Sequence, residues 1–195
     1  MVSAKLLVES AIDQLEREAR PAPRVLETAL AGLKQSLNEV RRISHRLRPA
    51  MLDELGLPAA LELLTREAED AGAAPVHLSV EGNPAPLPEE VKTALFRVSQ
   101  EALANVAKHA RARRVEITLA FARDGVALRI RDDGQGFEVD RIQLDPNRGI
   151  GLRNMRERLA SIGGTFEVLA TPGAGTLLLA KVPSEAIRRL ATAGT

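Results

Sequence analysis

Apolar positions in the first 50 residues recur with the spacing of a heptad repeat. Steps of four and three separate the members of one series, which are Leu26, Leu30, Leu33, Leu37, Val40, Ser44 and Leu47. Helices with this period wind around one another in coiled coils and bundles. Pro21 and Pro23 separate this helix from an earlier one with similar spacing. We therefore expect a hairpin of two helices over 1–50 and favour dimerisation through its apolar side over packing on its own domain.

Beyond residue 50 the pattern changes to short strands that alternate with helices. Apolar residues at every second position predict strands over 76–82, 115–121, 126–130, 165–170 and 176–183. Longer stretches predict helices over 52–72, 88–110 and 149–162, and a short helix or frayed end from Ser184. Because most strands form hairpins, we expect an α+β domain over 51–195. Its sheet should be mixed, mostly antiparallel, and covered by helices on one face.

Composition narrows the class of protein. Aromatic residues make up 2% of the chain, with no Trp or Tyr, so the core must be aliphatic. The absence of cysteine excludes disulfides and thiolate metal sites and fits a reducing cytoplasm. A net charge of +1 gives no overall attraction to nucleic acid or to an anionic membrane. No apolar run reaches the roughly 20 residues of a membrane span, so we expect a cytoplasmic segment, with any membrane anchor elsewhere in a longer parent.

The predicted helix over 88–110 carries a stripe of polar side chains that could bind a ligand or take part in catalysis. Glu101, Asn105 and Lys108 lie at steps of four and three, which places them on one side of an α-helix. A carboxylate can polarise water, an amide oxygen can bind Mg²⁺, and an ammonium can bind phosphate. By itself, however, such a stripe is more often a solvated helix surface.

Three glycine-bearing stretches follow, each of which has an ordinary structural interpretation. Asp132-Asp133-Gly134-Gln135-Gly136 comes directly after a strand and reads, alone, as a turn. Arg148-Gly149-Ile150-Gly151-Leu152 opens a helix, whose free N–H groups make either an anion site or a plain N-cap. Gly173-Ala174-Gly175-Thr176 precedes the last strand and is most simply a hairpin turn.

Taken in order, these stretches resemble the ATPase domain of histidine kinases. That domain belongs to the GHKL group, with gyrase, heat-shock chaperone ATPases and mismatch-repair ATPases. Its N box is similar to QEALANVAKHA, its first glycine box to RDDGQGF and its second to RGIGLRNMRERL. The resemblance covers about residues 55–183 and implies the Bergerat-type fold. SHRLRPAMLDELGL, with NVAKHA and GLRNMRERL, further resembles the nitrate-sensor and desaturase-regulating kinases.

The resemblance implies ATP and Mg²⁺ as cofactors and assigns roles by position. Asp132 would bind the adenine amino group, directly or through water, in a pocket shaped by Gly134 and Gly136. Asn105 would ligate Mg²⁺, and Glu101 would assist at the metal, through water, or act as the catalytic base.

The remaining positions that the resemblance assigns to ATP binding lie around the phosphates and behind the adenine. They are Lys108 and His109 near the phosphates or the nucleotide edge, Gly149, Gly151 and Leu152 along the triphosphate, and Thr176 behind the adenine. A short lid over roughly 138–148 would cover the nucleotide.

The phosphoacceptor histidine of such kinases lies on the first helix of the bundle, next to an acidic residue. VSAKLLVESAIDQLE resembles the sequence that follows this pair, so we expect the acceptor to precede Met1. His45 lacks an adjacent acid and reads as a solvent-facing helix residue, and His77 as a strand surface residue. We therefore expect this segment to bind ATP without phosphorylating itself at the usual site.

The main interpretation is the catalytic portion of a two-component sensor histidine kinase. Its parent would form a homodimer, phosphorylate its own histidine and pass the phosphate to an aspartate on a response-regulator receiver domain. Two alternatives are an anti-sigma-factor-type serine kinase, which shares the ATP-binding fold, and a non-catalytic module whose docking is gated by nucleotide. The heptad hairpin and LRPAMLDELGL argue against the serine kinase.

Overall fold

The computed structural model describes residues 52, 55–139 and 149–193. The chain divides between Ala50 and Met51 into two units, and all the described residues belong to the second. The predicted heptad helices and His45 lie outside the described residues, as does most of the expected lid, over 140–148. The described helices include none with the length and apolar character that crossing a membrane requires.

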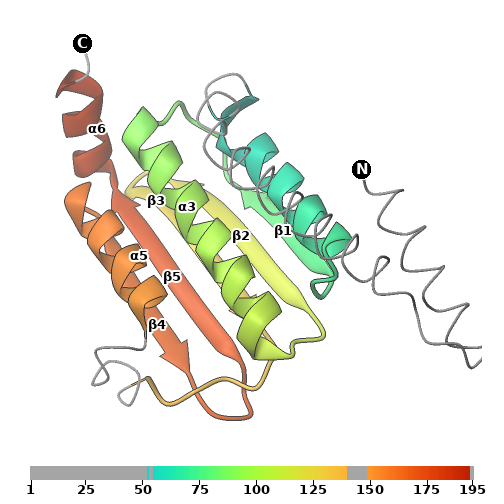
Figure 1. Ribbon diagram of the computed structural model, residues 1–195. Coiled ribbons are helices and arrows are strands. Elements are labelled where there is room, and N and C mark those ends of the chain that lie inside the picture. The colour runs from blue at the N-terminus through green and yellow to red at the C-terminus, as the bar shows by residue number, and fades with distance from the viewer. Residues whose placement is uncertain (1–51, 53–54, 140–148, 194–195) are drawn as a thin grey trace, which may run out of the picture. The chain divides into compact units, whose positions relative to one another are not determined.

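Five strands form one sheet in the described part of the chain (Figure 1). The strands are β1 (Val76–Glu81), β2 (Val115–Ala122), β3 (Gly125–Asp132), β4 (Thr165–Ala170) and β5 (Thr176–Pro183). Their order across the sheet is β1-β2-β3-β5-β4, and β1 pairs with β2 in parallel while the other three pairs are antiparallel. The sheet is therefore mixed and mostly antiparallel, as the hairpin pattern predicted.

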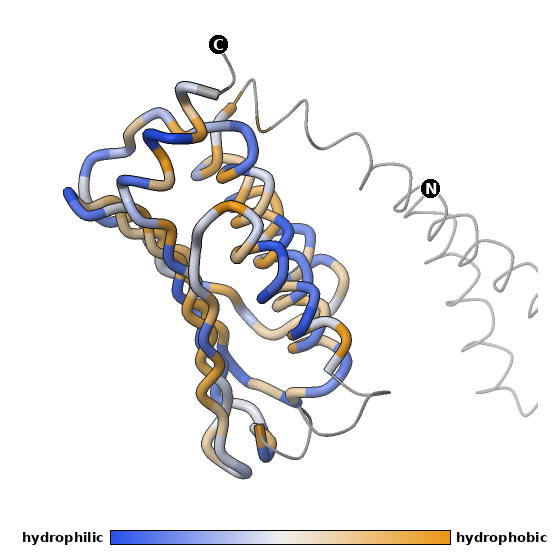
Figure 2. Tube along the Cα trace, turned by 90° about the vertical axis from the view of Figure 1, so that its left-hand side faces the viewer, coloured by the Kyte–Doolittle hydropathy of each residue, from blue (hydrophilic) through white to orange (hydrophobic). Residues whose placement is uncertain are grey.

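Helices cover one face of this sheet. They comprise a helix over residues 55–70, α3 (Glu89–Asn105), the π-helical turn η1 (Val106–Ala110), α5 (Ile150–Ser161) and α6 (Ser184–Ala193). In Figure 1 the helix over residues 55–70, α3 and α5 lie side by side in front of the strands. Figure 2, turned by 90°, shows the strands nearly edge-on beside the helices. The expected α+β arrangement is confirmed.

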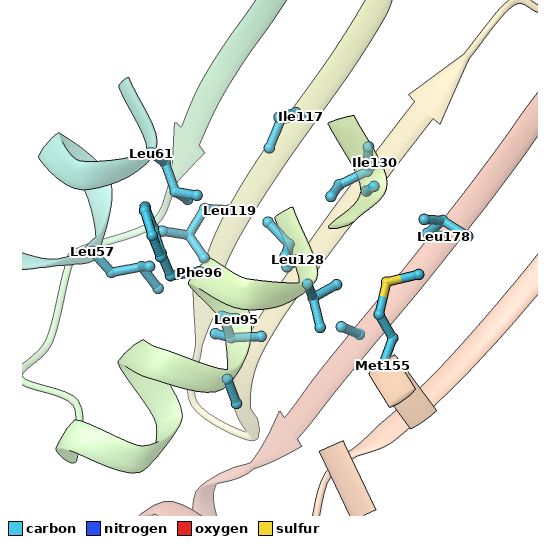
Figure 3. Packing of buried hydrophobic residues seen from close by; sticks show 14 of the residues in the cluster. Leu57, Leu61, Leu95, Phe96, Ile117, Leu119, Leu128, Ile130, Met155 and Leu178 are labelled. Carbon is cyan, nitrogen blue, oxygen red and sulfur yellow. The ribbon is translucent and has the colours of Figure 1, made fainter. Parts of the chain in front are cut away.

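The core lies between the sheet and these helices and is almost entirely aliphatic. Alternation decides which strand residues enter it, because successive side chains point to opposite faces. Ile117, Leu119, Leu128 and Ile130 are thus buried, whereas the residues between them face away. From the helices, Leu57, Leu61, Leu95, Phe96 and Met155 meet these strand residues (Figure 3). His77, on β1, is exposed as predicted.

The helix that was predicted over 88–110 changes type before it ends. Its α-helical part stops at Asn105, and the next five residues form the π-helical turn η1. Arg111, which follows, has a left-handed backbone with φ of 51°. A π-turn holds more residues per turn than an α-helix, so the rotation per residue falls. The expectation that Lys108 continues the α-helical stripe of Glu101 and Asn105 is therefore wrong.

Candidate functional site

A buried carboxylate stands at the end of β3. Asp132 lies in register between Val115 of β2 and Thr176 of β5 and is only 6% exposed. Gly134 N donates a hydrogen bond of 2.8 Å to Asp132 Oδ1. Among the described residues no donor binds the second carboxylate oxygen. Since no fully buried side-chain oxygen there lacks a partner, that oxygen must be reachable from outside. Asp132 therefore offers one acceptor to an incoming donor.

The loop after β3 is held between the end of the N box and the turn that joins β4 to β5. Gln135 N donates to Ala110 O at 2.8 Å, and Gln135 Nε2 donates to His109 O at 2.6 Å. On the other side, Gly173 N donates to Gln135 O at 2.7 Å. Gly134 packs so tightly that an added Cβ would lie 2.8 Å from Ala110 Cβ. Three stretches that are far apart in sequence thus meet at this loop.

The β4–β5 turn closes directly onto Asp132. A Cβ at Gly175 would lie 3.0 Å from the carbonyl carbon of Asp132, and one at Gly136 would lie 2.8 Å from Gly175 O. Thr176 begins β5 opposite Asp132 in the ladder. These contacts leave no room for side chains at the two glycines, since real Cβ atoms keep more distance from backbone atoms. The first glycine box and the G-x-G-T stretch therefore form one wall.

The second glycine box meets the long helix through Glu101. Gly149, with φ of 67°, precedes α5, and its carbonyl accepts a hydrogen bond of 2.9 Å from Arg153 N. Gly151 follows in the first turn of α5. A Cβ at Gly151 would overlap Glu101 Oε1 and lie 3.1 Å from Glu101 Cδ. The Glu101 carboxyl group therefore lies against the start of α5, where free N–H groups and the helix dipole favour an anion.

The end of the N box presents the remaining polar residues. Asn105 is half-buried as the last residue of α3, whereas Lys108 and His109 are exposed on η1. The described contacts bring the backbone of His109 to the site, through Gln135, but not its imidazole. A π-turn followed by a left-handed non-glycine residue, here Arg111, is a conformation that proteins retain most often at functional sites.

Asp133, beside the buried Asp132, has a different environment. Its Oδ1 accepts hydrogen bonds from the backbone N–H groups of Arg114, at 2.9 Å, and Arg113, at 2.7 Å. These two bonds, that of Arg114 first, lower the pKa of the Asp133 carboxyl below its ordinary value. Asp133 therefore clamps the connection between η1 and β2, and leaves Asp132 as the aspartate available to a ligand.

The donor set is compatible with magnesium bound together with phosphates. Among the described residues, no group of three or more histidines and acids could hold a metal ion alone. Mg²⁺ is usually bound by one or two protein oxygens, with water and substrate phosphates completing the octahedron. Asn105 and Glu101 are one helical turn apart on α3, beside the start of α5. They supply protein oxygens of the required number and kind.

Sequence reasoning named several of the residues that lie together here but assigned no role to two others. It placed Asp132, Gly134, Gly136 and Thr176 together, and the structure brings them into contact. It assigned nothing to Gln135 or to Asp133. Both lie within the recognised D-D-G-Q-G motif, but the residues they bind are 19 to 38 positions away. The sequence gives no signal for such pairings.

Comparison with known proteins connects this geometry to a family. Residues 90–186 match the family of histidine kinase-, DNA gyrase B- and HSP90-like ATPases. The chain is 35% identical over 185 residues to the sensor histidine kinase MctS of Rhizobium johnstonii, covering 93% of this chain and 40% of MctS. It is 34% identical to the sensor histidine kinase LiaS of Bacillus subtilis, over 79% of this chain and 41% of LiaS. The chain thus spans about two-fifths of the length of these relatives.

A solved structure has the same fold. The histidine kinase domain of the blue-light activated kinase EL346 from Erythrobacter litoralis superimposes with a TM-score of 0.60 at 15% identity. The alignment covers 96% of this chain and 97% of that one. The buried aspartate, the glycine walls and the N-box helix stand in a fold that this family uses for ATP. The chain therefore belongs to the sensor histidine kinases, and carries their GHKL-type ATPase catalytic domain.

Proposed function

We propose that this chain binds Mg²⁺-ATP at the site around Asp132 and serves as the catalytic portion of a two-component sensor kinase. In the longer protein it would transfer the γ-phosphate to a histidine and then to an aspartate of a response regulator. The observation that carries the proposal is the buried Asp132 carboxylate, with one oxygen open to a donor and two glycine-bearing segments, the first glycine box and the β4–β5 turn, packed against it.

Adenine recognition is assigned to the end of β3. The free oxygen of Asp132 would accept a hydrogen bond from the exocyclic amine, directly or through water, because a buried carboxylate needs donors to offset its desolvation. Gly134 and Gly136 would shape the pocket by allowing the backbone to approach the ring. Thr176, opposite Asp132 in the ladder, would stand behind the adenine.

The triphosphate is assigned to the space between α3 and the start of α5. Asn105 would hold Mg²⁺, with Glu101 assisting through water, and the ion would neutralise charge on the phosphate oxygens. Gly149, Gly151 and Leu152 would present backbone N–H groups to the phosphates. Glu101 would also accept the proton of the attacking nucleophile, which requires its carboxylate to stay where Gly151 now leaves room for it.

Lys108 and His109 are assigned to the outer edge of the nucleotide. Their exposure on η1 leaves them free to approach the phosphates, and the ammonium of Lys108 supplies a positive charge there.

The parent protein is proposed to work as a homodimer. Residues 1–50 would form part of its dimerisation hairpin and 51–195 the catalytic domain, with a receiver domain as the downstream partner. The net charge of +1 gives no basis for nucleic-acid or membrane binding by this segment. We place it in the cytoplasm.

Titration calorimetry with Mg²⁺-ATP tests the adenine assignment. Asp132→Asn replaces the acceptor oxygen by a group that also donates, and we expect affinity to fall at least tenfold, since a hydrogen bond to a charged group contributes about 1.5–3 kcal/mol. Asp124→Asn, in the exposed turn between β2 and β3, is the matched control and should bind as the wild type does. Equal affinity in all three proteins would refute the assignment.

A second measurement separates the kinase from its alternatives. The chain is incubated with labelled Mg²⁺-ATP and a separate helix fragment that carries a histidine kinase phosphoacceptor. Acid-labile phosphate on that fragment supports a histidine kinase. Nucleotide binding without transfer would favour a nucleotide-gated module, and acid-stable phosphate on a serine of an added anti-sigma antagonist would favour the serine kinase.

A further inference from the structure

The sheet has a second face, which no helix covers in the described part of the chain (Figures 1 and 2). Every second residue of each strand points to this face, and the register aligns these residues in rows across the strands. One row runs from Arg129 on β3 through Leu179 on β5 to Glu167 on β4. The next row runs from Arg131 through Leu177 to Leu169.

Leucines dominate the half of this face formed by β5 and β4. Leu169, on the edge strand β4, is 56% exposed and is among the most exposed large apolar side chains of the described residues. Leu177 and Leu179 are half-buried beside it. Beside these leucines the face is hollow: a cavity of about 210 Å³ is lined by Glu116, Thr118, Arg129, Arg131, Leu177 and Leu179. For comparison, a cavity of about 150 Å³ holds a benzene molecule.

Among the described residues, the charged side chains of the two rows form no ion pairs. Arg131 stands opposite Glu116 in the ladder, but Glu116 pairs with Arg114 at 2.6 Å. Within the described part of the chain neither Arg129 nor Glu167 takes part in an ion pair. Two strand spacings, about 9–10 Å, separate these two residues. The row therefore presents a cation, a leucine and an anion in that order.

This order is complementary to itself. A two-fold axis that lies parallel to β5, between two facing sheets, reverses the row of the second copy. Arg129 then faces Glu167 of that copy, and Leu179 faces its own equivalent. The same operation carries Leu169 of one copy over Arg131 of the other, where the hollow lies. Such matching of one patch with itself is the requirement for a two-fold interface.

We propose that the open sheet face is a self-association surface, on which a second copy of this chain packs sheet to sheet. The Arg129–Glu167 pairs would flank a strip of leucines, and Leu169 would fill the partner's hollow. Because Asp132 lies on the helix-covered face, this interface leaves the candidate nucleotide site open. It is distinct from any contact through the heptad helices.

Cysteine crosslinking tests the interface directly, because the chain contains no cysteine. In the full chain, Leu179→Cys should place two thiols near the axis, and a short bismaleimide should then link two copies in high yield. Ser161→Cys, on α5 and so on the opposite face, is the control and should crosslink at least tenfold less. Equal yields at the two positions would overturn the proposal, since association through the heptad helices alone would favour crosslinking at neither position 179 nor position 161.

Charge reversal in the Leu179→Cys background tests the register. Arg129→Glu or Glu167→Arg alone should reduce the crosslinked yield about tenfold or more, since like charges at an interface repel strongly. The double variant should recover most of the yield. Leu169→Ser, an exposed and structurally mild change, should reduce it as well. Circular dichroism confirms that each variant is folded. Unchanged yields in the folded single variants, or no recovery in the double variant, would refute the proposed pairing.

Discussion

Gly175 offers a sharp test of how the site is built, because Gly173 in the same turn provides its control. Both glycines have left-handed backbones, with φ of 80° and 81°. An alanine at either position lowers the free energy of unfolding by about 1–2 kcal/mol, because alanine disfavours that conformation. The less flexible unfolded chain offsets this loss by about 0.4–1 kcal/mol. Nothing lies within 4 Å of a Cβ at Gly173, so Gly173→Ala should cost about 1 kcal/mol.

At Gly175 a second penalty is added. The new Cβ would overlap the Asp132 carbonyl oxygen and lie 3.2 Å from the Cα of Asp133. These are backbone atoms of the last residue of β3 and of the residue that follows it, and they cannot rotate away as the end of a side chain does. Overpacking of this kind costs about 1–3 kcal/mol, which brings the total for Gly175→Ala to about 3 kcal/mol.

Urea unfolding of the full chain, followed by circular dichroism, gives the difference between the two variants. We expect Gly175→Ala to be less stable than Gly173→Ala by about 2 kcal/mol, which is roughly 1 M in urea midpoint for a typical dependence on denaturant. Gly175→Ala should also bind Mg²⁺-ATP more weakly, because the Asp132 backbone must move. Equal urea midpoints for the two variants would show that the turn at Gly175 does not pack against the Asp132 backbone as described.

Two further predictions concern residues that the tertiary contacts single out. Gly151→Ala should leave the free energy of unfolding within about 1 kcal/mol of wild type, because only the flexible end of Glu101 must move. The rate at which this variant transfers phosphate from Mg²⁺-ATP to a separate histidine-bearing fragment should fall at least tenfold, because the Glu101 carboxylate is displaced. An unchanged rate would remove Glu101 as the base. Asp133, whose pKa is lowered in the folded state, stabilises the fold above pH 4, and this contribution is lost as the pH falls through the folded pKa. The melting temperature of wild type should therefore approach that of Asp133→Asn on acidification, and a constant difference from pH 7 to pH 3 would contradict this.

The sequence by itself determined the elements and most of the candidate site. Alternating apolar residues in short runs specify strands, and they placed Ile117 and Leu128 in the core because a strand's side chains alternate strictly between two faces. The glycine boxes and Asp132 could be named as a candidate site only because their order along the chain resembles that of a known family, since each stretch alone is most simply a turn or a helix cap.

Only the tertiary structure decided how these segments meet. The change from α-helix to π-turn at Val106 occurs where Ala110 and His109 are hydrogen-bonded to Gln135, and helical periodicity contains no information about such contacts. The opposition of Glu101 to Gly151 likewise depends on how α5 packs beside α3. The rows of the open face depend on the register of β3, β5 and β4. Pairings between distant segments are set by the packing of the whole domain, so no local pattern records them.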